Sequence, residues 1–134
     1  MTTTDVVDDE VKLIRHRLIA RRLAVDPEMI DRARQRFEGM AAEYGEADFV
    51  VEWRTILDAG LLKVRRRLVA RDEDAYRLRL SSPFSTVSGL PLSDEALRRR
   101  IWRIGQRLVR RRQHRLLAEI YSEMEEIGSL TPKL

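Results

Sequence analysis

Apolar residues recur at steps of three and four along most of this chain, which is the period of an amphipathic helix. Sustained alternation of apolar and polar residues, the mark of a strand, is missing from the sequence. The pattern therefore predicts an all-α fold, a compact bundle of about five helices with a long C-terminal helix. The expected helices span residues 7–25, 27–44, 48–60, 61–70, 71–80 and 93–128.

Polar residues and glycines mark the expected helix ends. Side chains that accept hydrogen bonds from free helix N–H groups precede four of the helices. These expected N-terminal caps are Asp26, Asp48, Asp72 and Ser93, and the expected C-terminal stops are Gly45, Gly60 and Gly128. The serines, glycine and prolines of residues 80–92 predict a loop. Expected core residues include Leu61, Val64, Leu68, Trp53 and Trp102.

The last helix is too long for the domain that it belongs to. At 1.5 Å per residue its roughly 35 residues measure about 52 Å, whereas a domain of this size is about 30 to 35 Å across. We therefore expect part of it to project. The expected organisation is a disordered N-terminus at 1–6, a helical domain at 7–110, a projecting helix end at 111–128 and a tail at 129–134.

The distribution of charge along the chain is more informative than its total. The 134 residues carry 26 Lys and Arg against 22 Asp and Glu, a net charge of only +4. Residues 93–118 hold nine arginines and two acids, whereas residues 119–126 hold four glutamates and no base. The last helix is thus expected to have a basic middle and an acidic end.

Two surfaces on this helix are candidate binding sites. A basic row can follow a phosphate backbone or contact an acidic partner, although it can equally be a solvated face paired with neighbouring acids. It consists of Arg99, Arg103, Arg107, Arg110, Arg111 and Arg115. An apolar strip nearer the end is expected to contact a partner protein or a second copy, unless the helix bends back onto its own domain. It consists of Leu116, Leu117, Ile120, Tyr121, Met124 and Ile127.

Several function classes find no support in the sequence. The absence of cysteine excludes disulfides, thiol nucleophiles and thiolate zinc sites. Both histidines, His16 and His114, lie among arginines, and no catalytic or phosphate-binding motif occurs. We therefore expect no enzyme, no catalytic residues, no metal and no cofactor. No apolar run nears the roughly 20 residues that cross a bilayer, and the N-terminus is acidic, so we expect a soluble cytoplasmic protein without a membrane partner.

A helix-turn-helix is one possible interpretation of residues 19–46. Small and apolar residues stand near the positions where such a motif packs its two helices. Residues 27–46, however, hold five acids and three arginines, and an acidic recognition helix does not suit a groove lined by phosphates. Ordinary antiparallel packing of the first two helices is the favoured interpretation.

Several short motifs resemble a group of small bacterial helical proteins. They include His16-Arg17-Leu18-Ile19-Ala20, Asp26-Pro27, Ala33-Arg34, Trp53-Arg54-x-x-Leu57 and Leu78-Arg79-Leu80-Ser81-Ser82-Pro83-Phe84, the last matching a pattern L-R-x-S-S-P-F. That group is described as antitoxin-like or regulator-associated, and some members follow a DNA-binding domain. The resemblance covers about residues 14–84, and the long last helix falls outside it.

The resemblance implies a partner-binding helical module. The leading hypothesis is a non-enzymatic antitoxin-like protein of a bacterial toxin–antitoxin system, which neutralises a cognate toxin by direct binding. One alternative is a nucleic-acid-binding transcriptional regulator that contacts phosphates through the basic row. The other is a homo-oligomeric helical scaffold, with a homodimer as its simplest form.

Overall fold

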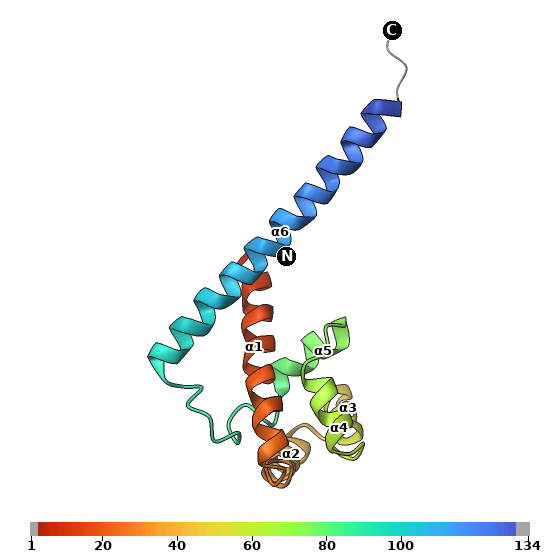
Figure 1. The fold of residues 1–134 in the computed structure, drawn as a ribbon. Helices are drawn as coiled ribbons and strands as arrows, with labels where there is room; N and C mark the ends of the chain where they lie inside the picture. The colour runs from red at the N-terminus through yellow and green to blue at the C-terminus, as the bar shows by residue number, and fades with distance from the viewer. Residues whose placement is uncertain (1–2, 131–134) are drawn as a thin grey trace.

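The computed structural model describes residues 3–130, and all regular elements in that range are helical. Figure 1 shows a group of short helices at one end of a central helix and a long helix crossing its other end. The predicted all-α fold class is confirmed. The elements are α1 (Thr3–Val25), α2 (Met29–Tyr44), α3 (Asp48–Leu57), α4 (Leu61–Leu68), α5 (Glu73–Leu78), a 3₁₀ turn (Arg79–Ser81) and α6 (Glu95–Leu130).

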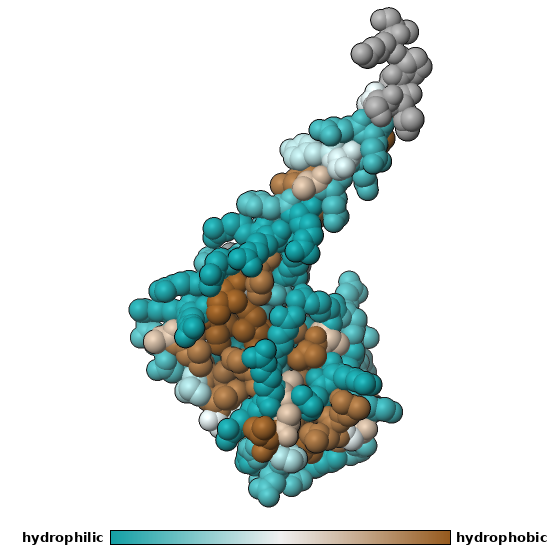
Figure 2. Space-filling view, in the orientation of Figure 1, coloured by the Kyte–Doolittle hydropathy of each residue, from teal (hydrophilic) through white to brown (hydrophobic). Residues whose placement is uncertain are grey.

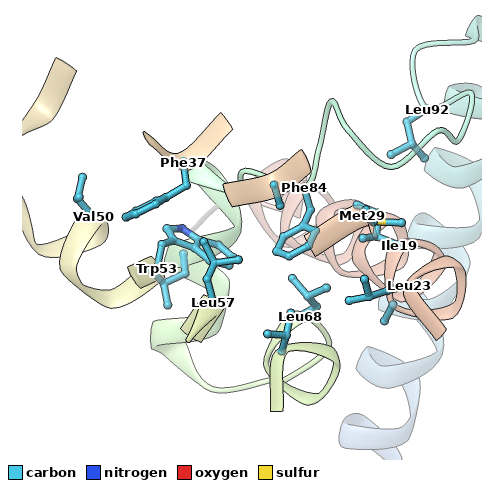
Figure 3. Close-up of a cluster of buried hydrophobic side chains, with 14 residues drawn as sticks. Ile19, Leu23, Met29, Phe37, Val50, Trp53, Leu57, Leu68, Phe84 and Leu92 are labelled. Carbon is cyan, nitrogen blue, oxygen red and sulfur yellow. The ribbon is translucent and has the colours of Figure 1, made fainter. Parts of the chain in front are cut away.

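The core lies where α2 to α5 gather around the C-terminal half of α1 (Figure 1). Phe84 is fully buried although it belongs to the loop that follows the 3₁₀ turn. Its ring centroid lies 6.2 Å from that of Trp53, and both rings are seen among the core side chains in Figure 3. The Trp53 indole also donates a hydrogen bond of 3.1 Å to the Ser81 hydroxyl. The serine-proline-phenylalanine motif therefore fastens the loop to the core.

The N-terminal helix begins earlier than the pattern predicted. Residues 3–6 are helical, so the expected disordered N-terminus is wrong for them, while residues 1–2 lie outside the described residues. Val7 is buried, and Asp5 stands in the first turn, where the helix dipole favours a carboxylate. Packing and charge together therefore favour the helical form of this turn.

Only one of the four expected N-terminal caps forms. Asp72 accepts a hydrogen bond from the Ala75 amide, as predicted. The Asp26 carboxylate instead pairs with Arg32 at 2.6 Å, and α2 starts at Met29. Asp48 is the first residue of α3 and caps nothing. Asp94 rather than Ser93 receives the Leu97 amide at 2.9 Å. More than one polar side chain near each helix start can accept these hydrogen bonds, and the sequence alone does not show which one does.

Three further expectations need correction. Leu61 is 37% exposed, because α4 buries only Val64 and Leu68, which lie one turn apart. Trp102 is half-buried at the α1–α6 crossing, whereas Trp53 is in the core as predicted. Gly128 does not end the last helix, which continues to Leu130, so the expected tail begins inside a helix. The rest of that tail, residues 131–134, lies outside the described residues.

The first two helices do not pack as an antiparallel pair. In Figure 1, α1 lies in the plane of the view while α2 is seen along its axis. The buried face of α2, formed by Met29, Ala33 and Phe37, belongs to the same core cluster as Trp53 of α3. The interpretation as simple antiparallel packing is therefore wrong, because α2 packs mainly with α3 and makes few contacts with α1.

Candidate interaction surfaces on the C-terminal helix

The position of α6 is set by a close crossing with α1. Ile101, Gly105 and Val109 form a buried stripe at steps of four residues. A Cβ atom at Gly105 would lie only 3.1 Å from Cγ2 of Val11, so glycine allows the two helices to approach here. The crossing holds α6 over about its first four turns and leaves the remainder of the helix unsupported.

An ion pair between a buried glutamate and an exposed arginine marks the end of this crossing. Glu10 of α1 is only 2% exposed, and its Oε2 accepts a hydrogen bond of 2.6 Å from Arg112 of α6. Arg71 approaches the same carboxylate oxygen at 3.6 Å. The pair joins residues 102 positions apart. Sequence reasoning missed both partners, because nothing local distinguishes Arg112 from the arginines on either side of it.

The predicted apolar strip lies beyond this pair, on the part of α6 that stands clear of the body. Every residue from 110 to 128 is exposed, and Figures 1 and 2 show this end of the helix extending away from the other helices. The strip residues are between 42% and 65% exposed: Leu116, Leu117, Ile120, Tyr121, Met124 and Ile127. The helix does not bend back, so the body of the molecule does not cover this strip.

The predicted basic row lies partly on the crossing segment and partly on the projecting end. Arg99, Arg103, Arg107 and Arg110 follow one another at steps of four, four and three and share one exposed face. Arg111 and Arg115 are exposed beside them. Arg99 pairs with Glu95. The guanidinium groups of the other five make no hydrogen bond or ion pair with any residue in the range 3–130.

The two surfaces have opposite charge and adjoin each other on one continuous helix. The arginines precede Leu116, and the glutamates at positions 119, 123, 125 and 126 accompany the strip. A partner that covers the strip therefore meets apolar side chains bordered by carboxylates. A partner that follows the arginine row meets guanidinium groups, which suit phosphate or carboxylate oxygens.

Other types of site find no counterpart in the described part of the chain. Its His, Asp and Glu residues nowhere gather in a group able to hold a metal ion. None of its helices combines the length and apolar character needed to span a bilayer. Comparison with known proteins gave no matching family model, curated protein or solved structure.

Proposed function

We propose that this chain is a non-enzymatic, antitoxin-like protein that binds and neutralises a cognate toxin through the projecting end of α6. The observation that carries the proposal is the apolar strip at residues 116–127, exposed on a helix that its own domain leaves uncovered. The toxin as partner comes from the resemblance of residues 14–84 to antitoxin-like proteins. The strip supplies the means of binding.

The physical argument starts from the cost of leaving this strip in water. Fully burying one large apolar side chain contributes about 1.5 to 3 kcal/mol. Six such residues, roughly half exposed, therefore offer on the order of 5 kcal/mol or more to a partner that covers them. A helix that lays its apolar face into a groove is a common mode of protein recognition.

The charges around the strip indicate what kind of partner surface would be complementary to it. Four glutamates and no basic residue stand between positions 119 and 126. The complementary surface is therefore an apolar groove with Lys or Arg along its rim, since opposite charges favour association and select the partner.

The first experiment tests whether the strip binds the toxin. We expect the chain to co-purify with the product of the neighbouring gene and to relieve its toxicity in co-expression. Leu117→Glu with Ile120→Glu should weaken binding on the order of 100-fold, because two apolar anchors become charged. Ala118→Glu with Ser122→Glu adds the same charge to the opposite face of the helix and should leave binding unchanged.

Two results of that experiment would overturn the proposal. One is a monomer that leaves the toxin fully active. The other is an equal loss of binding in both double variants, which would show that the strip is not the contact. Loss of self-association alone in Leu117→Glu with Ile120→Glu would identify the homo-oligomeric scaffold instead.

A second candidate function is binding of nucleic acid along the arginine row. It is favoured because Arg103, Arg107, Arg110, Arg111 and Arg115 have no acidic partner within residues 3–130. The contacts would be to phosphates, because no base-reading motif is visible.

This second function predicts steep salt dependence. Replacing Arg107, Arg110 and Arg111 by Gln should abolish binding to a short DNA duplex or an RNA of equal length, because each arginine lost removes a phosphate contact. Arg17, Arg21 and Arg22, exposed on α1, give a matched triple Gln variant that should bind normally. If both variants bound equally weakly, or if binding did not respond to salt, the arginine row would be excluded as the nucleic-acid binding site.

A further inference from the structure

A cavity of about 360 Å³ lies between α1 and the segment that joins the 3₁₀ turn to α6. Lys12, Arg15 and His16 of α1 line it on one side. Arg79 of the L-R-x-S-S-P-F motif lines it as well, together with the hydroxyl residues Ser85, Thr86 and Ser93. Neither of the surfaces on α6 includes these residues.

Arg79 is buried without a carboxylate. It is only 3% exposed, and its Nη1 donates hydrogen bonds to the carbonyl oxygens of Leu68 at 3.1 Å and Ala70 at 2.8 Å. Its guanidinium carbon lies 4.6 Å from the ring centroid of Tyr76. Its Nε and Nη2 find no acceptor anywhere in residues 3–130. A buried cation with unmade hydrogen bonds is destabilising, so this group favours an additional acceptor, best of all a negatively charged one.

His16 presents a second unused atom beside it. The ring is 2% exposed, and Nδ1 lies 2.8 Å from the Lys12 carbonyl oxygen. Because a carbonyl only accepts, Nδ1 carries the proton, and Nε2 is left with a lone pair. Nε2 is buried and has no partner among the described residues. His16 is therefore a neutral group in the cavity wall, close enough for its ring signals to report on a bound ligand.

The remaining cavity wall is positive and hydroxylated. The side chains of Lys12, Arg15 and Arg79 bring three cationic groups, and no Asp or Glu lines the cavity. The Arg15 guanidinium already donates to the Leu92 carbonyl oxygen at 3.0 Å, which holds it in place beside the loop. A carboxylate carries one charge and two oxygens. A phosphate monoester carries up to two charges and three terminal oxygens, and so satisfies more of these donors.

We propose that this cavity binds the phosphoryl group of a small phosphate monoester, with Arg79 as its buried anchor. The uncompensated charge of Arg79 attracts the phosphoryl group from within the cavity wall, while Lys12 and the loop hydroxyls contact its oxygens. Bound phosphate thereby ties the loop at residues 82–93 to α1. This proposal is independent of the toxin-binding function, because it uses no residue of α6.

The two histidines of the chain provide a direct readout and its control. His16 lines the cavity, whereas His114 is exposed on the projecting end of α6. In ¹⁵N histidine spectra of the full chain, glycerol 3-phosphate should shift the ring signals of His16 in a saturable manner and leave those of His114 unchanged. Acetate and chloride at the same ionic strength should move neither. A His16 shift of equal size with acetate, or no His16 shift with the ester, would overturn the proposal.

A pair of variants tests the cationic wall without touching the buried anchor. Lys12→Gln should weaken glycerol 3-phosphate binding about tenfold, because one charge-assisted hydrogen bond is lost. Arg22→Gln removes the same charge from an exposed site of α1 outside the cavity and should bind normally. If both variants bound glycerol 3-phosphate equally weakly, the loss of binding would be due to net charge alone, and the proposed specific site would be refuted. Inorganic phosphate, tested in parallel, should bind less tightly than the ester. Tighter binding of inorganic phosphate would refute the proposal that the ligand is a phosphate monoester.

Discussion

Three ionisable side chains, those of Glu10, His16 and Arg79, are buried in this molecule. Glu10 is neutralised by Arg112 at 2.6 Å, with Arg71 nearby at 3.6 Å. Arg79 has backbone carbonyls and the Tyr76 ring as partners but no carboxylate. His16 stays uncharged, because burial lowers its pKa to about 4, and the neighbouring charges of Arg79 and Arg15 act in the same direction. The protonation of His16 is therefore coupled to folding between about pH 4 and 6.5.

The lowered pKa of His16 makes stability depend on pH. The unfolded chain binds a proton at His16 below its ordinary pKa of 6.5, whereas the folded chain does so only near 4. Stability from this group is therefore fully present above pH 6.5 and is lost as the pH falls toward 4. The full loss is about 3 kcal/mol. Urea unfolding in acetate and MES buffers should show this decline.

Matched histidine variants separate this effect from the titration of carboxylates. His16→Gln should flatten the stability profile between pH 4 and 6.5, while His114→Gln at an exposed position should keep the wild-type profile. Identical profiles for both variants would show that His16 titrates normally in the folded protein.

At the scale of elements, the α1–α6 crossing is the contact that positions both interaction surfaces. Ile101 and Val109 are buried on either side of Gly105. Arg112, about one helix turn after Val109, donates a hydrogen bond to Glu10. The place where α6 leaves the body is thereby set by packing and by the ion pair of Arg112 with the buried Glu10.

Gly105→Leu should open this crossing. The new side chain would meet Val11, whose Cγ2 already lies 3.1 Å from an added Cβ, and we expect stability to fall by about 2 to 3 kcal/mol. Gly39→Leu is the matched control, because Gly39 is exposed on α2 with no atom within 4 Å of an added Cβ. It should stabilise the protein by up to about 1 kcal/mol through helix propensity. Thermal unfolding measures both, and a neutral Gly105→Leu would contradict the close packing described here.

At the scale of the whole molecule, the structure separates a folded body from an exposed rod. Residues 110–128 are exposed throughout, so they bury little surface on folding. The rod therefore carries binding surface without contributing a hydrophobic core. This division explains how one short chain combines a stable helical body with an uncovered apolar strip.

Truncation should distinguish the two parts. A chain ending at residue 113 keeps Arg112 and should unfold within about 2 °C of the full-length melting temperature, because it loses only exposed side chains. A chain ending at residue 100 loses Ile101, Gly105 and Val109 and should melt far lower or fail to fold. Circular dichroism melts measure both. A strongly destabilised 1–113 chain would show that the rod supports the body.

The helical period was enough to predict the number and approximate bounds of the helices, because each apolar stripe is local in the sequence. Val64 and Leu68 of α4 and the cap at Asp72 follow from such local signals. The cap at Asp26 did not form, because the Asp26 carboxylate pairs with Arg32 and the helix starts only at Met29, after a turn at Pro27. The Glu10–Arg112 pair was beyond prediction, because a single sequence does not reveal which of nine clustered arginines meets an acid a hundred residues away.

Local patterns along the chain are enough to show that this protein is helical and that its last helix exceeds the width of a small domain. They also show that the end of that helix is acidic and striped with apolar side chains. These are properties of spacing and charge along one chain. Three other features emerge only from the packing of the helices: the place where α6 crosses α1, the exposure of the strip, and the meeting of Arg79 and His16 in one cavity. Those outcomes depend on contacts between distant segments, whose free energy comes from burial and from pairing that no local pattern encodes.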